Sequence, residues 1–166
     1  MESKIKEMPS SQEAENSVLG CILLDGEKSF DKVIPWIRND NAFYTTDNKK
    51  IWKAVKILRK NKEPIDLITV ANTLKEEGDD SISYYLSGLT DTIATTANIE
   101  NHAKIVWEKY VQREVRTTSY KMNNVSFDKY EKTMPLINSQ LRWLEELRDL
   151  QPDRVNDLES MVEDAV

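Results

Sequence analysis

Few residues in this chain of 166 are of the types that carry out covalent chemistry. It has one cysteine, Cys21, and one histidine, His102, which could form a nucleophile and its base. Cys21, however, lies on the apolar face of a predicted helix, where a buried and inert thiol is the usual case. His102 lies near the predicted start of another helix. We therefore favour structural roles for both residues.

The remaining candidates for chemistry are the glycines and one acidic run. None of Gly20, Gly26, Gly78 and Gly88 lies in a glycine-rich loop followed by Lys and Ser or Thr, so the sequence has no phosphate-binding loop. The acidic run at residues 76–80 lacks the alternating oxygen ligands of a calcium loop and is better explained as a solvated helix end. We therefore expect no active site, metal or cofactor in this chain.

A basic stretch is the sharpest local feature, because residues 49–62 carry seven cations in 14 positions. On a helix, Ile51, Val55 and Leu58 would face inward and the cations outward. The cations, with Trp52 stacking on a base, could contact single-stranded DNA, or they could contact an acidic protein. An ordinary surface helix with Trp52 in the core is the simpler interpretation, which we favour. The candidate contact residues are Lys49, Lys50, Lys53, Lys56, Arg59 and Lys60.

Composition and charge limit the class of protein. Apolar residues make up 39% of the chain and charged residues 31%, with four glycines and five prolines, which excludes a disordered or turn-rich β protein. The net charge of −6 argues against a protein that binds nucleic acid through phosphate contacts alone. No export signal or membrane-length apolar run is visible, and one cysteine fits a reducing compartment, so we expect a cytoplasmic protein.

Helix start and stop signals predict an all-α fold. A capping box from Ser10 to Glu13 opens a first helix that ends at Gly26, and Pro35 should split the next. Further short helices are predicted from a cap at Thr46 or Asp47 to about Asn61, at 67–77 after an Asp66 cap, and around Tyr84. Two long helices, 97–123 and 127–150, then form an antiparallel hairpin. A last amphipathic helix follows Pro152. The predicted domains are a compact bundle of short helices (1–96), a long hairpin (97–150) and the start of a linker helix (151–166).

The hairpin helices carry apolar stripes at heptad-like spacing. From the pattern alone, internal packing and self-association explain these stripes equally well. We assign hairpin packing and subunit contacts to Val111, Val115, Thr118, Met122, Ile137, Leu141 and Leu144. The last helix is only about three turns long and needs a surface for its apolar face, so we assign docking to Val155, Leu158 and Val162.

Two runs of the sequence, P-S-S-Q-E-A-E-N-S-V-L-G at 9–20 and P-I-D-L-I-T-V at 64–70, match motifs of a known family in the right order. They resemble the opening and the P-I-D-x-I-T-L motif of the N-terminal domain of a bacterial or phage replicative DNA helicase of the DnaB type. Phe43-Tyr44 and T-A-N-I at 96–99 match further motifs in the right order. The glycine pair that the family carries before its Y-L motif is absent here, where residues 81–84 read S-I-S-Y.

The resemblance implies a non-catalytic collar module, because the ATPase motor that would hold ATP and Mg²⁺ is missing from this sequence. In the family, such domains form dimers that assemble as a trimer of dimers on the hexameric ring, and they recruit the C-terminal domain of primase. The linker helix docks on a neighbouring motor. We therefore expect the chain to associate with itself, with primase and in some systems with a helicase loader, and to bind DNA weakly or not at all. The parent protein would be an ATP-dependent helicase.

Two alternatives stay open. The chain could be a stand-alone phage adaptor or inhibitor that mimics the collar, although its end inside a predicted helix suggests a piece of a longer protein. It could also be a single-stranded DNA-binding module built on the basic helix. DNA affinity that falls steeply with salt would indicate the second alternative.

Overall fold

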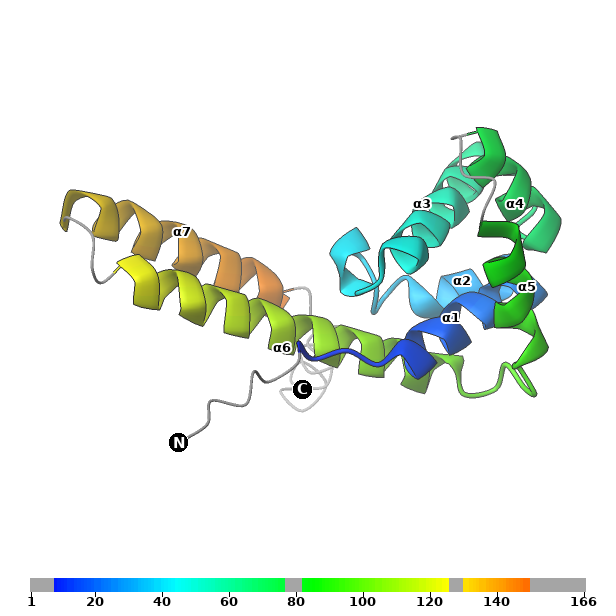
Figure 1. Cartoon of the computed structure of the whole chain (residues 1–166), viewed down its shortest axis with the longest axis horizontal. Helices are drawn as coiled ribbons and strands as arrows, with labels where there is room; N and C mark the ends of the chain where they lie inside the picture. Colours follow the sequence, from blue (N-terminus) through cyan, green and yellow to red (C-terminus); the bar gives the residue numbers. More distant parts are fainter. Residues whose placement is uncertain (1–7, 77–81, 126–129, 150–166) are drawn as a thin grey trace, which may run out of the picture. The chain divides into compact units, whose positions relative to one another are not determined.

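A computed structural model describes residues 8–76, 82–125 and 130–149, and within these ranges all regular structure is helical (Figure 1). The predicted all-α fold is confirmed. The chain divides into two compact units, Met1–Tyr110 and Val111–Val166, with α6 continuing from the first into the second. The elements are α1 (Gln12–Asp25), α2 (Glu27–Val33), η1 (Asp40–Ala42), α3 (Thr46–Asn61), α4 (Leu67–Glu76), α5 (Ile82–Asp91), α6 (Ile99–Val125) and α7 (Tyr130–Asp149).

The residues that cap α1 and α3 lie next to those that the sequence predicts. Ser11, rather than Ser10, caps α1: its backbone is extended and its hydroxyl accepts a hydrogen bond from the Ala14 N–H at 3.3 Å. Thr45 in the same way caps α3 by accepting from the Asn48 N–H at 3.3 Å. A side chain can cap only from an extended backbone just before the first helical residue, so a neighbour of the same type cannot replace it.

The other helix boundaries follow local chemistry. Gly26 ends α1 with a φ of 58°, and a Cβ there would lie 2.9 Å from the Ile65 carbonyl oxygen, so both backbone and space require glycine. α2 stops at Val33, two residues before Pro35. Asp66 opens α4 by accepting hydrogen bonds from the N–H groups of Ile68 at 2.8 Å and Thr69 at 2.9 Å.

The core of the first unit forms where α1 meets α2, α3, α4 and α5. Trp52 of α3 is fully buried and lies with ring centroids 5.4 Å from Phe30 and 5.5 Å from Phe43. Gly20 lets α1 approach α5 closely, because a Cβ at this position would lie 2.5 Å from the Leu89 carbonyl oxygen. The largest side chains that are fully buried with them include Leu19, Ile22, Ile37, Ile51, Leu74, Leu86 and Ile99.

A buried polar cluster ties three of these helices together. The carboxylate of Glu15, which is 1% exposed, accepts hydrogen bonds from the Tyr44 N–H at 2.8 Å and from Asn48 Nδ2 at 2.9 Å. Asn48 is fully buried, and its amide nitrogen also lies 3.3 Å from Asn16 Oδ1. The Tyr85 hydroxyl lies 2.9 Å from both Asn16 Oδ1 and Asn48 Oδ1. The cluster therefore joins α1, α3 and α5 to the loop before α3.

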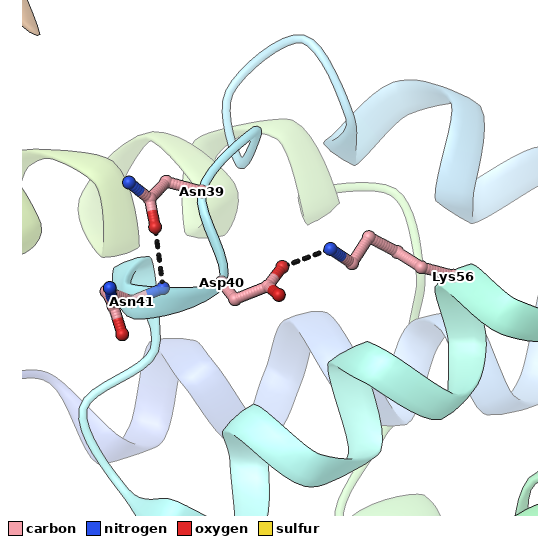
Figure 2. A network of polar contacts seen from close by, with 4 residues as sticks. All are labelled: Asn39, Asp40, Asn41 and Lys56. Carbon is pink, nitrogen blue, oxygen red and sulfur yellow. Dashed lines mark hydrogen bonds and ion pairs between the residues drawn. The ribbon is translucent and has the colours of Figure 1, made fainter.

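Polar contacts fix the η1 turn, and Figure 2 shows two of them. Asn39 accepts a hydrogen bond from the Asn41 N–H at 2.9 Å and so caps the turn. Asp40 forms an ion pair with Lys56, which reaches over from α3. The amide of Asn39 also donates to the Tyr110 hydroxyl at 2.9 Å, which attaches the turn to α6.

The second unit contains the end of α6 and all of α7, which runs in the opposite direction to α6 (Figure 1). Pro135 lies inside α7, in its second turn, so the helix lacks one backbone hydrogen bond near its start. The predicted linker helix at 151–166 lies outside the described residues.

Candidate interaction surfaces

Cys21 and His102, the residues with potential for covalent chemistry, both lie in the first unit, where Cys21 is buried and His102 half-buried. Cys21 is 1% exposed, and its sulfur lies 3.9 Å from the Thr95 carbonyl oxygen. Burial, and secondly the charge of Asp25, raises the pKa of the Cys21 thiol, which lowers its thiolate fraction at neutral pH. The Nδ1 atom of His102 is buried without a hydrogen-bond partner among the described residues. Among the described residues, Cys21 and His102 are therefore not hydrogen-bonded to each other, as a nucleophile and its base would be.

The acidic run falls mostly outside the described residues, since only Glu76 at the end of α4 is included. Within the described ranges, no group of three or more His, Cys, Asp or Glu side chains is arranged to hold a metal ion. In the same ranges, no helix is both long and apolar enough to cross a membrane.

The hairpin residues divide into an inward set and an outward set. Thr118 on α6 is 6% exposed and Leu147 on α7 is 7% exposed, so both are packed within the chain. The half-buried residues of α7 recur every three or four positions toward Leu147, which marks the face turned to the rest of the unit. They are Thr133, Leu136, Ile137, Gln140, Trp143 and Leu144.

The outward set is apolar and evenly spaced. Val115 and Met122 are seven residues apart on α6 and are 46% and 44% exposed. Met134 and Leu141 are seven residues apart on α7 and are 42% and 55% exposed. Seven residues are close to two helical turns, so each pair shares one face of its helix, with about 10 Å between its members. Val115 and Met122 thus share one exposed face of α6, a helix that also exposes Tyr120, and Met134 and Leu141 share one exposed face of α7.

Of the predicted interface residues, Val115, Met122 and Leu141 are exposed. Val111, Ile137 and Leu144 are half-buried, and Thr118 is buried. The first three are placed where a partner could reach them, whereas the others support the packing from which the exposed residues project. The predicted docking residues Val155, Leu158 and Val162 lie outside the described residues, so their role stays a prediction.

The basic helix is α3, and the structure separates its cations into two kinds. Lys56 pairs with Asp40, and Arg59 Nη2 lies 2.9 Å from Asp31 Oδ1, with its guanidinium 5.8 Å from the centre of the Phe30 ring. Lys53 and Lys60 are exposed, and Lys49 and Lys50 are half-exposed. Trp52 is fully buried, so it cannot stack on a nucleotide base.

Sequence reasoning missed two features. The burial of the Glu15–Asn48–Tyr85 cluster could not be predicted, because a polar residue in an amphipathic helix is ordinarily assigned to the solvent-exposed face. Tyr84 and Ile68, which are 91% and 68% exposed, were not singled out, because burial depends on how α4 and α5 rotate against the core.

Comparison with known proteins identifies the relatives of this fold. A family model described as "DnaB-like helicase N terminal domain" matches residues 7–108. The chain is 33% identical over 135 residues to the "Replicative DNA helicase DnaB" of Buchnera aphidicola. The matched region covers 78% of this chain and 28% of that protein. It is 38% identical over 120 residues to the "Replicative DNA helicase DnaC" of Bacillus subtilis. This second match covers 67% of this chain and 25% of that protein.

A solved structure shows the same architecture. The crystal structure of the N-terminal domain of DnaB helicase from Mycobacterium tuberculosis superposes with a TM-score of 0.72 at 27% sequence identity. The match covers 80% of this chain and 99% of that one. The chain spans about a quarter of the length of the two helicases that it matches in sequence. Since the family model covers more than half of the chain, the protein belongs to the family of DnaB-like helicase N-terminal domains.

Proposed function

We propose that this chain is the collar module of a hexameric replicative DNA helicase and that it assembles through the hairpin of α6 and α7. The observation that supports this role is the outward set of the hairpin: Val115, Met122, Met134 and Leu141, which are between 42% and 55% exposed. Apolar side chains that are exposed in a repeating pattern indicate a surface that is covered in an assembly. A second copy of the same hairpin is the occupant that the family role requires.

The two pairs suit an isologous interface, in which the same patch on each subunit contacts itself. Rows of apolar residues spaced by seven pack against similar rows at small crossing angles, as in other helix bundles. A dimer formed in this way would be the unit from which a trimer of dimers is built.

A charge at the centre of the outward set tests the assembly role. Leu141→Asp would place a carboxylate in the contact, whereas the first unit does not depend on this side chain. We expect the mass of the oligomer, measured by multi-angle light scattering, to fall to that of the monomer while helicity by circular dichroism is unchanged.

Ser139→Asp is the matched control, because it adds the same charge at an exposed position on another side of α7. The oligomer should survive this change. If Leu141→Asp leaves the oligomer as intact as Ser139→Asp does, Leu141 does not lie in the subunit contact.

Primase recruitment is the second part of the proposed role. We propose that the C-terminal domain of the primase from the same genome binds the assembled module, and that an intact subunit contact is needed. Calorimetric titration of the chain with that domain should show micromolar or tighter binding, which weakens in Leu141→Asp. If no heat is measured at either of two temperatures, this chain is not sufficient to recruit primase.

The parent protein, in this proposal, is an ATP-dependent DNA helicase whose motor domain holds ATP and Mg²⁺. The chain itself acts through its surfaces. We propose no catalytic step for any of its residues. A helicase loader is a further candidate partner of the assembled ring.

A further inference from the structure

One exposed face of α3 has no role in the core or in the hairpin. Lys49, Lys53, Ile57 and Lys60 are separated by four, four and three residues, so they lie along one side of the helix. We call these four residues the α3 stripe. The buried residues of α3, which include Trp52 and Leu58, belong to the opposite side.

The cations that flank the stripe are already neutralised, but those of the stripe are not. Lys56 pairs with Asp40, and Arg59 pairs with Asp31. Within the part of the chain that the structure describes, Lys49, Lys53 and Lys60 have no ion-pair partner. The chain as a whole carries a net charge of −6, so this local positive charge is not a consequence of overall composition.

The chemistry of the stripe does not suit single-stranded nucleic acid. Such sites combine a basic groove with aromatic rings on which bases stack, but Trp52 is fully buried between Phe30 and Phe43. The middle of the stripe is instead occupied by an aliphatic side chain, since Ile57 is 39% exposed. Three lysines alone would give only weak and strongly salt-dependent phosphate binding.

We propose that the α3 stripe is a docking surface for an acidic amphipathic helix of a partner protein. Lys49 and Lys53 are about 6 Å apart along the helix axis, and Lys53 and Lys60 about 10 Å. A partner helix with carboxylates at the same spacing, four and seven residues apart, places one near each lysine. An apolar side chain between its second and third carboxylates then covers Ile57. The stripe belongs to the first unit, whereas the residues of the proposed assembly role belong to the second.

The probe for this surface is a fluorescent synthetic helical peptide with glutamates at that spacing and a leucine facing Ile57. Its binding to the full chain is measured by fluorescence anisotropy and compared with a peptide in which glutamine replaces each glutamate. A labelled thymidine oligonucleotide serves as the nucleic-acid probe. The stripe variant is Lys49→Glu/Lys53→Glu/Lys60→Glu. Its matched control changes three other exposed lysines by the same charge, as Lys28→Glu/Lys75→Glu/Lys121→Glu.

We expect the glutamate peptide to bind the unchanged chain and the control variant with similar affinity. The stripe variant should bind about eightfold more weakly or worse, since three exposed ion pairs that each contribute about twofold are lost and the new glutamates repel those of the peptide. Ile57→Ser should also weaken peptide binding, without any change of charge. Circular dichroism verifies that all variants are folded.

Three results would overturn the proposal. The first is equal peptide binding by the stripe and control variants. The second is oligonucleotide binding that the stripe variant loses and Ile57→Ser retains, which would assign the surface to nucleic acid. The third is a fall in oligomer mass in the stripe variant but not in the control, which would assign it to a second copy of this chain.

Discussion

Asn48→Ala is the sharpest test of how the first unit is held together. Asn48 is fully buried and is the side chain that donates to Glu15 Oε2, at 2.9 Å. Removal of its amide leaves one oxygen of a carboxylate that is 1% exposed without this donor. The Tyr85 hydroxyl loses one of two acceptors but keeps Asn16 at 2.9 Å.

The expected cost follows from the charge of the group that is left behind. A hydrogen bond to a buried charged group contributes about 1.5–3 kcal/mol, and an unsatisfied group in the interior costs a similar amount. The contact between Asn48 and Asn16, at 3.3 Å, adds a smaller contribution. We therefore expect Asn48→Ala to lower the free energy of unfolding by about 2–4 kcal/mol. Asn101→Ala, at an exposed position of α6, should change it by less than about 0.5 kcal/mol.

Urea unfolding measures this difference directly. Three of the four tryptophans, Trp36, Trp52 and Trp107, belong to the first unit, so their fluorescence mainly follows its unfolding. A shift of the midpoint at constant slope would be a change in stability alone. Coincident transitions by fluorescence and circular dichroism would justify a two-state treatment.

A double-mutant cycle with Glu15→Ala then tests the reason for the loss. If Asn48 matters because it satisfies the Glu15 charge, Asn48→Ala should cost at least about 1.5 kcal/mol less when Glu15 is already absent. Costs that add to within about 0.5 kcal/mol would refute the reasoning, because the two side chains would then act independently.

Three further predictions concern the same unit. Gly20→Ala should destabilise it by about 1–3 kcal/mol in thermal unfolding, because the new methyl group meets the Leu89 carbonyl, whereas Gly88→Ala, with open space around it, should be neutral or stabilising. Burial raises the pKa of the Tyr85 hydroxyl, so the unfolded chain loses this proton at lower pH than the folded chain. Stability should therefore fall as the pH rises above about 10, and Tyr85→Phe should show a shallower fall in urea titrations at several pH values. Cys21 should react with a maleimide slowly in the folded chain and quickly in urea, and fast labelling of the folded chain would contradict its burial.

The helices could largely be predicted from the sequence, because their signals are local. The α4 helix begins at Leu67 as expected and α3 begins one or two residues before its expected start, and the stop at Gly26 and the break before Pro35 are as predicted. Ser10 was the wrong cap because the choice between adjacent serines depends on backbone angles that the pattern does not contain.

The surfaces could be predicted only in part, because side-chain partners come from distant parts of the chain. The α7 stripe includes Leu141 and Leu144 together, yet only Leu141 is mostly exposed. An apolar stripe is wider than the face that one neighbouring helix covers, so periodicity alone cannot separate the two. Similarly, the basic run gives no sign that Lys56 pairs with Asp40, since the pair needs the η1 turn to bring Asp40 close.

The polar cluster around Glu15 also bears on the order in which the first unit can come apart. Its hydrogen bonds need α1, α3, α5 and the loop at Tyr44 at the same time, so a state that releases any one of them leaves a polar group stranded in the interior. Partial opening is thereby penalised relative to complete unfolding, which makes the unit cooperative. The Tyr44 amide, which donates to Glu15, should consequently be among the slowest to exchange its hydrogen with solvent.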